Sequence, residues 1–337
     1  MTAGRDASVF LARTGWDEAV RAPLAGDASN RRYERLRQGA EHAVLMDADP
    51  ARGEDVRPFL AIARHLSALG FSAPRVLAED VENGFLLLED LGDDLYARVV
   101  ARQPQAEMEL YGAAVDVLAA LHAHAPPEGL ADYGPQEMGK LAALAAEWYM
   151  PGATGRAALA GLAAELAGIV TELTMPLMPA RPVLVLRDYH AENLLWLPAR
   201  AGVARVGLLD FQDARAGHPA YDLISLTEDA RRDTTADLRA AMTARHCTLT
   251  GTESEAFGTA CALLAAQRNL RILGVFARLG LRDGKPGYIA LMPRVWAHLM
   301  RDLTHPATAP LARLVHAHLP PPDAEVQARL RAACRGR

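Results

Sequence analysis

The first ninety residues alternate apolar and polar positions over short runs, which is the pattern of half-buried β-strands. We expect strands at residues 26–36 and 42–49 and a strand pair within 74–90. From Val56 to Leu69 the apolar positions recur at helical spacing instead, and Gly70 stands where a helix cap is expected. The pattern therefore predicts a small β-rich lobe, residues 1–92, that contains one helix.

Beyond residue 92 the pattern is mainly helical and rich in Ala and Leu. Helices are expected at residues 108–124, 156–173, 260–280 and 293–300, with a short last helix behind the prolines at 320–322. Only two β-like segments, residues 183–198 and 204–214, interrupt this pattern. We therefore predict an α+β fold in which a larger helical lobe, residues 93–337, carries one β-hairpin.

Polar side chains stand at the ends of these β-like segments. Asp188 follows the apolar run 183–186, Asn193 begins the next run, and Asp210 ends the run VGLLD. Two adjacent antiparallel strands would bring Asn193 and Asp210 together, with Asp188 across the loop. An Asp-x-x-x-x-Asn spacing by itself is more often a capped turn. The arrival of Asp210 at the same end of the hairpin favours an active site.

Carboxylate and amide oxygens of this kind suit Mg²⁺, which usually takes one or two protein carboxylates together with substrate phosphates. An acid that faces such a metal pair can hold a hydroxyl group in line for attack on a phosphoryl group. A modest base suffices, because the loose transition state loses the hydroxyl proton late. Asp222, at the start of a later helix, is expected to cap that helix or to brace the catalytic loop.

The overall composition excludes some classes of protein. Half of the 337 residues are hydrophobic and 23% are charged, and the net charge of −5 argues against a nucleic-acid partner. No apolar run approaches the ~20 residues that cross a bilayer, and the N-terminal stretch lacks the apolar core of a signal peptide. Three distant cysteines without CxxC spacing argue against disulfides and thiolate metal sites. We expect a cytoplasmic monomer with no membrane partner.

Taken together, the segments LRDYHAENLLWL and VGLLDFQDARAGHPAYDLISL resemble the aminoglycoside phosphotransferase-like kinases, which share the two-lobed protein-kinase fold. Members of that family carry a His-x-Asp-x-x-x-x-Asn loop, an Ile/Leu-Asp-Phe/Trp strand end and a Tyr/Phe-Asp-Leu helix start. The resemblance implies ATP and Mg²⁺ as cofactors. It also implies that Asp188 is the catalytic base, that Asn193 and Asp210 are the metal ligands, and that Asp222 is a structural brace.

Several blocks along the chain, among them GDASNRRYERL, GFLLLEDLGDD and QRNLRILGVFARL, are similar more narrowly to the sugar anomeric kinases. That family phosphorylates N-acetylmuramate and N-acetylglucosamine at the C1 hydroxyl in peptidoglycan recycling. The resemblance implies a small amino-sugar substrate. It leaves open which of the two sugars, and which anomer, is preferred.

The sequence departs from the kinase pattern at three places. Leu186 replaces the histidine of the catalytic loop, Val44 or Met46 stands where the third strand should carry a lysine, and no G-x-G-x-x-G occurs. Another cation must neutralise the ATP phosphates, and Arg31 or Arg32 is the candidate. The nucleotide-binding residues that follow from the resemblance are Ser29, Asn30, Arg31, Arg32, Glu89, Asp90 and Leu91, the last three through main-chain contacts with adenine.

Residues that flank the base, together with more distant ones, are expected to line the acceptor pocket. The expected substrate-binding residues are Arg187, His190, Glu147, Tyr149, Arg268 and Arg271. His190 is equally compatible with a solvated or merely supporting role, and Tyr149 with a place in the core. An arginine is expected near the acceptor because muramic acid carries a carboxylate.

Two other functions stay open. Kinases of this fold act on choline, homoserine, aminoglycosides or ketosamines, but a cationic acceptor needs acidic or aromatic surroundings. The stretch QRNLRILGVFARLGLRDGK is locally basic instead. The missing lysine and histidine also leave open a nucleotide-binding regulator without turnover. Retention of Asp188, Asn193 and Asp210 favours the kinase.

Overall fold

The computed structural model describes residues 5–24 and 30–335, and the chain divides into two compact units. Unit 1 comprises Met1–Val117 and Ala191–Ala214, and unit 2 comprises Leu118–His190 and Arg215–Arg337. Each unit is thus made of two chain segments, whereas the boundary expected at residue 92 is a single cut along the sequence. The lobe boundary at residue 92 stays a prediction.

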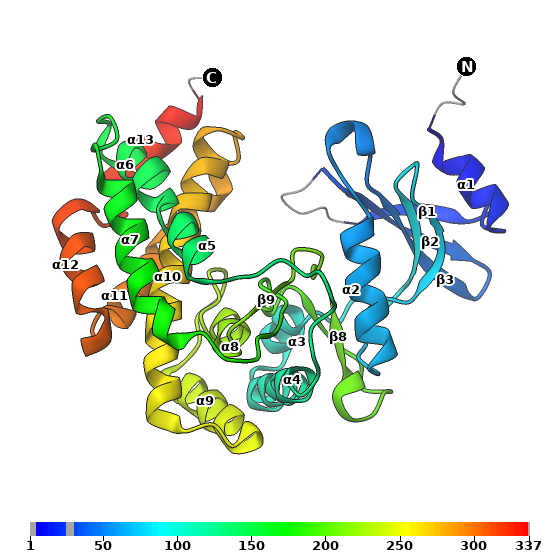
Figure 1. The fold of residues 1–337 in the computed structure, drawn as a ribbon. Coiled ribbons are helices and arrows are strands. Elements are labelled where there is room, and N and C mark those ends of the chain that lie inside the picture. The colour runs from blue at the N-terminus through cyan, green and yellow to red at the C-terminus, as the bar shows by residue number, and fades with distance from the viewer. Residues whose placement is uncertain (1–4, 25–29, 336–337) are drawn as a thin grey trace. The chain divides into compact units, whose positions relative to one another are not determined.

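Unit 1 is built on a five-stranded antiparallel sheet in the order β1-β2-β3-β5-β4 (Figure 1). The strands are β1 Val20–Leu24, β2 Arg32–Gln38, β3 Glu41–Asp47, β4 Val76–Asp80 and β5 Phe85–Glu89. The helices are α1 Ala7–Arg13, α2 Arg57–Ala68, α3 Tyr96–Arg102 and α4 Glu107–His122, whose last residues belong to unit 2. The strands β2 to β5 and the helices α2 and α4 lie where the sequence predicts strands and helices. Helix α1 and strand β1 are not among the predicted elements.

One face of this sheet forms a core with helix α1. The buried residues of this core are Phe10, Leu11, Leu36, Ala43, Leu45, Phe85 and Leu87. Side chains alternate along a strand, so the intervening residues lie on the opposite face, among them Tyr33, Val44 and Met46. The β4–β5 turn requires glycine, because Gly84 has a φ of 68° and a Cβ atom there would lie 1.9 Å from the Ala48 carbonyl oxygen.

A second, two-stranded sheet of unit 1 confirms the expected β-hairpin. Its strands are β7 Leu194–Trp196 and β8 Val206–Leu208, which are antiparallel. Arg200, in the connection between them, donates hydrogen bonds to Ser72 Oγ at 2.7 Å and to Glu89 Oε1 at 2.8 Å. The Leu208 N–H donates to the Ser72 carbonyl at 2.9 Å. These bonds attach the hairpin to the segments that flank the five-stranded sheet.

Unit 2 is mainly helical, as expected (Figure 1). Its helices are α5 Pro135–Ala142, α6 Met150–Thr154, α7 Leu162–Thr174, α8 Ala220–Thr227, α9 Ala236–Thr250, α10 Ser254–Leu281, α11 Met292–Asp302, α12 Ala309–His318 and α13 Ala324–Arg335. A π-helical turn, Ala145–Tyr149, leads into α6. The strands β6 Val183–Val185 and β9 Arg215–Gly217 form an antiparallel pair. The run at 183–187 therefore pairs with a segment beyond the hairpin, which the hydrophobic pattern does not reveal.

Helix α10 is the central helix of unit 2. It is long and apolar enough to cross a membrane by length and composition, yet 78% of its most apolar window is buried inside the protein, as in a core helix. It packs against the π-helical turn so closely that a Cβ atom on Gly274 would lie 2.3 Å from the Leu144 carbonyl carbon. Only glycine fits this helix crossing.

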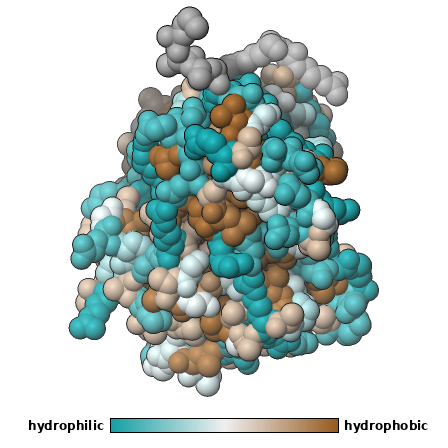
Figure 2. Space-filling model, turned by 90° about the vertical axis from the view of Figure 1, so that its right-hand side faces the viewer, coloured by the Kyte–Doolittle hydropathy of each residue, from teal (hydrophilic) through white to brown (hydrophobic). Residues whose placement is uncertain are grey.

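Large exposed hydrophobic side chains are scattered rather than gathered. In Figure 2, a hydrophobic area near the centre of the face is surrounded by hydrophilic residues. Within residues 5–24 and 30–335 the exposed large hydrophobic residues are Val9, Val20, Leu77, Met108, Leu159, Met175 and Leu249. Single residues of this kind are ordinary on a protein surface and do not indicate a docking site.

Candidate active site

The segment that follows β6 makes a tight turn with an unusual backbone. Arg187 has a φ of 72°, and the Asp188 N–H donates to the Leu186 carbonyl at 3.0 Å, which closes a γ-turn of the rare positive-φ kind. Among the residues that the structure describes, only Arg187 and Asp210 adopt positive φ without being glycine. Backbone conformations of this cost are found mostly at functional sites, where the surroundings enforce them.

Asp222, in the first turn of α8, holds this γ-turn in place. It is fully buried, its Oδ2 accepts from the Leu186 N–H at 2.6 Å, and its Oδ1 accepts from the Arg187 N–H at 2.8 Å. Burial raises the pKa of Asp222 to about 7, although the two N–H donors act in the opposite direction. Because Asp222 binds the main chain of Leu186, this contact does not require the histidine that the family carries there.

Asp188 is half-buried and lies near several cations. Burial by itself would raise its pKa, but the charges of Arg271, His190 and Arg187 outweigh that effect and hold the pKa of Asp188 below its ordinary range. The carboxylate is therefore ionised at neutral pH. An ionised carboxylate can accept a hydrogen bond and then a proton from a hydroxyl group.

A pair of tyrosines organises the cations beside Asp188. Arg271 donates to the Tyr221 hydroxyl at 2.8 Å, and the Tyr133 and Tyr221 hydroxyls are 3.1 Å apart. The two rings meet edge to face with 4.8 Å between centroids, and the Arg187 guanidinium lies 5.5 Å from the centre of the Tyr133 ring. Sequence reasoning missed both tyrosines, although Tyr221 stands directly before Asp222 in the Tyr-Asp-Leu motif.

In unit 1, the β7–β8 pair brings Asn193 and Asp210 together, as expected. Asn193 Nδ2 lies 3.4 Å from Asp210 Oδ2, and Gln212 Nε2 donates to Asp210 Oδ1 at 2.7 Å. Asp210 has a φ of 56°, and the Leu209 N–H donates to the Asn193 carbonyl at 3.0 Å. The proximity of the two side chains is confirmed, and their role as metal ligands stays a prediction.

The donor set at Asn193 and Asp210 fits Mg²⁺. One carboxylate and one amide oxygen suit a cation that keeps waters and takes its other ligands from phosphates. Nowhere in the described part of the chain do three His, Cys, Asp or Glu side chains gather into a metal cluster. The arrangement therefore does not fit a metal that needs a complete cage of protein ligands.

Phe211 ties this turn to helix α2. Its side chain is fully buried, and its ring stacks on Phe59 of α2 with 5.0 Å between centroids. The position of Asp210 therefore depends on the position of α2. Sequence reasoning did not single out Phe59, because nothing in the helical pattern distinguishes it from other apolar residues that face the core.

The nucleotide-binding residues expected near the start of β2 differ in their contacts. Ser29 lies outside the described residues. The Asn30 N–H and Arg31 Nε donate to the two oxygens of Glu54, at 3.0 and 2.9 Å. Arg32 donates instead to the carboxylate opposite it on β3, at 2.7 Å. Arg31 and Arg32 thus pair with different carboxylates. The sequence did not decide which of the two arginines would neutralise the ATP phosphates.

The segment after β5 is partly engaged within unit 1. The Glu89 N–H donates to the Arg75 carbonyl at 2.9 Å, so that main-chain donor is not available to an adenine. The Asp90 carboxylate binds Arg35 at 2.7 Å. The adenine contacts expected of Asp90 and Leu91 stay predictions, while the one expected of the Glu89 N–H is disfavoured by this bond.

Two of the expected substrate residues of unit 2, Arg268 and His190, are buried among other protein groups. Arg268 is buried and donates to the Glu228 carbonyl at 3.2 Å and to Ser225 Oγ at 2.9 Å. His190 is buried beside Arg231, with 3.4 Å between Nε2 and the guanidinium, and burial lowers its pKa. Of the arginines expected near a substrate carboxylate, Arg271 therefore suits that role better than Arg268.

The two remaining substrate candidates lie near the π-helical turn. Tyr149 is fully buried, its hydroxyl donates to the Pro320 carbonyl at 2.6 Å, and its ring faces Trp296. It occupies the core position that the sequence left open and has no surface to offer a sugar. Glu147 is exposed on a groove of about 520 Å³ between α5 and α7, which Lys140 also lines.

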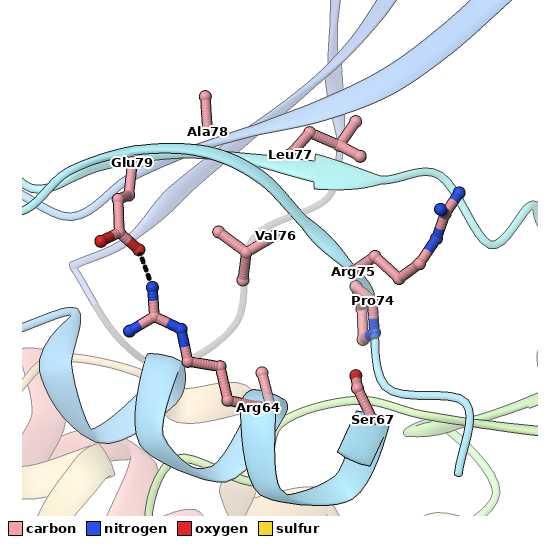
Figure 3. A pocket seen from close by; sticks show the side chains of 9 residues that line it. Arg64, Ser67, Pro74, Arg75, Val76, Leu77, Ala78 and Glu79 are labelled. Atoms are coloured by element: carbon pink, nitrogen blue, oxygen red, sulfur yellow. Dashed lines mark hydrogen bonds and ion pairs between the residues drawn. The ribbon is translucent and has the colours of Figure 1, made fainter. Parts of the chain in front are cut away.

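A second groove, of about 490 Å³, lies in unit 1 between α2 and the edge strand β4 (Figure 3). Arg64 and Glu79 bond across it at 2.5 Å, and the side chains of Val76 and Ser67 contribute to its lining. None of the expected catalytic or metal-binding residues lines this groove.

Comparison with known proteins shows which protein family the chain belongs to. Residues 20–257 match the Phosphotransferase enzyme family, and the chain belongs to that family. Among solved structures, a choline kinase, LicA, from Streptococcus pneumoniae is 14% identical in sequence with a TM-score of 0.61, covering 88% of this chain and 99% of its own. At that identity the likeness concerns the fold, which is protein-kinase-like as expected.

Two relatives of higher sequence identity indicate a narrower group within this family. The N-acetylmuramate/N-acetylglucosamine kinase of Caulobacter vibrioides is 37% identical, over 93% of this chain and 96% of its own length. The N-acetylmuramate/N-acetylglucosamine kinase of Pseudomonas aeruginosa is 35% identical, over 86% of each chain. These matches confirm both resemblances seen in the sequence, to the aminoglycoside phosphotransferase-like kinases and, more narrowly, to the sugar anomeric kinases.

Proposed function

We propose that this chain is a kinase that phosphorylates the C1 hydroxyl of N-acetylmuramate, N-acetylglucosamine or both, with ATP and Mg²⁺, in peptidoglycan recycling. The observation that carries the proposal is the similarity of nearly the whole chain to kinases named for these two sugars. Because ATP is available inside the cell, we infer that the reaction takes place in the cytoplasm. The charge and hydrogen bonding of the candidate residues agree with phosphoryl transfer.

On the side of unit 1, Asn193 and Asp210 would hold the metal ion. When bound, Mg²⁺ neutralises charge on the nucleotide phosphates. Gln212 orients Asp210 through its 2.7 Å hydrogen bond, and the buried Phe211 fixes the turn that carries it. These contacts preorganise the ligand pair, so little ordering is left for the moment of binding.

On the side of unit 2, Asp188 would act as the base. It accepts a hydrogen bond from the sugar hydroxyl and takes its proton as the hydroxyl oxygen bonds to the γ-phosphorus. The bond between that phosphorus and ADP breaks in the same step. A carboxylate with a low pKa is sufficient, because the proton leaves late in a loose transition state. Asp222 keeps the γ-turn, and with it the direction of Asp188, in place.

The acceptor side carries positive charge, and this favours an anionic acceptor over a polycationic one. Arg271 and Arg187 both lie near Asp188. A guanidinium binds a carboxylate in a fork-like manner, so Arg271 is suited to the lactyl carboxylate of N-acetylmuramate. We therefore assign Arg271 to the substrate, and Arg268 and His190 to the support of the loop.

An acceptor panel tests this proposal. Release of ADP is measured with N-acetylmuramate, N-acetylglucosamine, choline and an aminoglycoside, each at several concentrations with ATP and Mg²⁺. We expect kcat/KM to be at least about 100-fold higher for one or both amino sugars than for the cationic acceptors, since two cations near Asp188 repel them. A preference for choline or the aminoglycoside would overturn the assignment of the acceptor, and binding of ATP without turnover on any acceptor would support a regulator instead.

A further inference from the structure

Unit 1 contains no lysine. The whole chain has two lysines, Lys140 and Lys285, and both belong to unit 2. If unit 1 holds the phosphates of ATP beside Asn193 and Asp210, the cation that pairs with them within this unit must be an arginine. Arginine suits this purpose because its planar guanidinium binds phosphate oxygens in pairs.

The alternation along β2 separates its arginines between the two faces of the sheet. Arg32 lies on the face of the α1 core, where it pairs with Asp47 at 2.7 Å. Arg31 hydrogen-bonds to the Tyr33 side chain, which lies on the opposite face across from Met46. Met46 is one of the two positions at which the kinase pattern places its lysine. Arg31 is therefore on the side of the missing lysine, and Arg32 is not.

Arg35 shares the face of Tyr33 but has a different function. Its guanidinium donates to Asp93 Oδ2 at 2.7 Å, to Asp90 Oδ1 at 3.1 Å and to the Gly92 carbonyl at 3.3 Å. Two carboxylates and a carbonyl surround this cation, and their negative charge opposes a phosphate. Arg35 thus holds the segment after β5 in place.

Arg31 pairs with a carboxylate from the segment that leads into α2. Glu54 accepts from Arg31 Nε at 2.9 Å through one oxygen and from the Asn30 N–H at 3.0 Å through the other. The side chains of Arg31 and Glu54 are only 13% and 12% exposed. This shielded contact joins the start of β2 to the segment before α2, much as a protein kinase pairs the lysine of its third strand with a glutamate of its helix αC.

We propose that Arg31, positioned by Glu54, binds the terminal phosphates of ATP in place of the missing lysine. The inference rests on the proposed function, because it requires ATP as the phosphoryl donor. Arg31 is the binding residue and Glu54 acts through it. Helix α2, which begins three residues after Glu54, contacts the Asp210 turn through Phe59 and Phe211, so neighbouring parts of unit 1 hold the cation and the expected metal ligand.

Isothermal titration of single variants with ATP and with adenosine, both with Mg²⁺, tests this proposal. We expect Arg31→Gln to weaken ATP binding by about 10- to 100-fold, as the loss of a charge-assisted hydrogen bond does, and to leave adenosine binding within about threefold. Arg31→Lys restores part of the affinity for ATP. Arg21→Gln is the matched control, because Arg21 also pairs with a glutamate of the same sheet, Glu34 at 2.6 Å.

A double-mutant comparison tests the part of Glu54. Glu54→Gln alone weakens ATP binding, and in the Arg31→Gln background it has no further effect, because Glu54 acts only through Arg31. An Arg31→Gln protein that binds ATP as tightly as the wild type, or that loses adenosine to the same degree as ATP, overturns the inference while leaving the proposed function intact. A wild-type protein that phosphorylates neither sugar and does not bind ATP overturns both.

Discussion

The pKa of Asp188 is lowered by Arg271, which is distant in the sequence, and by its sequence neighbours His190 and Arg187. The Asp-x-x-x-x-Asn spacing and the β-like runs around it were enough to single out Asp188, Asn193 and Asp210. Arg271, the first of the residues that lower the pKa of Asp188, belongs to helix α10, and the tyrosine that accepts its hydrogen bond, Tyr221, belongs to α8. Arg187, His190 and Arg271 were expected near the acceptor, but no local pattern predicts the contact of Arg271 with Tyr221, because it joins two helices that are distant in the sequence.

Replacement of Asp188 is the first test at the scale of single residues. Asp188→Asn keeps the size of the side chain and removes the proton acceptor, so we expect kcat to fall by about 10²- to 10⁴-fold. ATP affinity should stay within about twofold, because nucleotide and metal contacts are assigned to unit 1. Steady-state kinetics and isothermal titration measure the two quantities. Turnover near that of the wild type would show that Asp188 is not the base.

The pH dependence of activity tests the charge around Asp188. The pKa of Asp188 is lowered below the ordinary range of an aspartate, so the carboxylate stays ionised throughout the neutral and weakly acidic range. Loss of kcat/KM through protonation of Asp188 should therefore not be seen at any pH above about 5. In Arg271→Met the largest favourable charge is lost, the pKa rises, and the acid limb should move upward in pH. An acid limb that stays in place, or moves downward, would contradict the assignment. Reduced binding of N-acetylmuramate in this variant is a separate, pH-independent loss.

At the scale of elements, long periodic segments and the β7–β8 hairpin were predicted, whereas the pairing of β6 with β9 was not. Helix α10 and the β2, β3 and β5 strands follow clear hydrophobic periods, and the structure has them where the pattern indicates. The strands β6 and β9 have three residues each and pair across the hairpin, which is too little sequence to fix a register. The π-helical turn is a tertiary feature, because it forms where α10 packs against it.

Two glycines of α10 test that packing. A Cβ atom on Gly274 would collide with the Leu144 main chain, whereas none of the described neighbours comes within 4 Å of a Cβ atom on Gly258. We expect Gly274→Ala to lower the free energy of unfolding by about 1–3 kcal/mol, as overpacking does. Gly258→Ala, in the same helix, should raise it by up to about 1 kcal/mol through helix propensity. Urea unfolding measures both, and equal effects would show that the contact at Gly274 does not limit stability.

At the scale of the whole molecule, each compact unit is made of two chain segments, whereas the expected lobes are divided at one position, residue 92. The segment Ala191–Ala214 returns to unit 1, so the expected metal ligands belong to the unit of the five-stranded sheet, while Asp188 belongs to unit 2. A linear reading of hydrophobic patterns cannot anticipate this, because the return depends on contacts such as those of Arg200 with Ser72 and Glu89.

A group of buried histidines links the stability of unit 2 to pH. Burial lowers the pKa of His122 to about 3 and those of His218 and His246 to about 4. The unfolded chain binds these protons near pH 6.5, so the stabilisation is complete above that pH and is lost as the pH falls. We expect the free energy of unfolding to decrease between pH 6.5 and 5 by up to about 1.4 kcal/mol per pH unit for each histidine.

His246→Phe checks this origin of the acid sensitivity. In the wild type, the His246 ring stacks on Phe257 with 4.7 Å between centroids. A phenylalanine ring can keep this stacking and cannot take up a proton. The slope of unfolding free energy against pH should become shallower in this variant, and it should not change in His318→Gln, whose histidine is exposed. An unchanged slope in His246→Phe would contradict the account.

The central claim is that the chain transfers phosphate from ATP to the C1 hydroxyl of an amino sugar. Phosphorus NMR of the product formed from N-acetylmuramate and from N-acetylglucosamine tests it most directly, because it identifies both the acceptor and the hydroxyl that is modified. The account predicts a phosphate resonance coupled to the anomeric proton for at least one of the two sugars, together with ADP. Phosphate on another hydroxyl, or no sugar phosphate from either substrate, would contradict it.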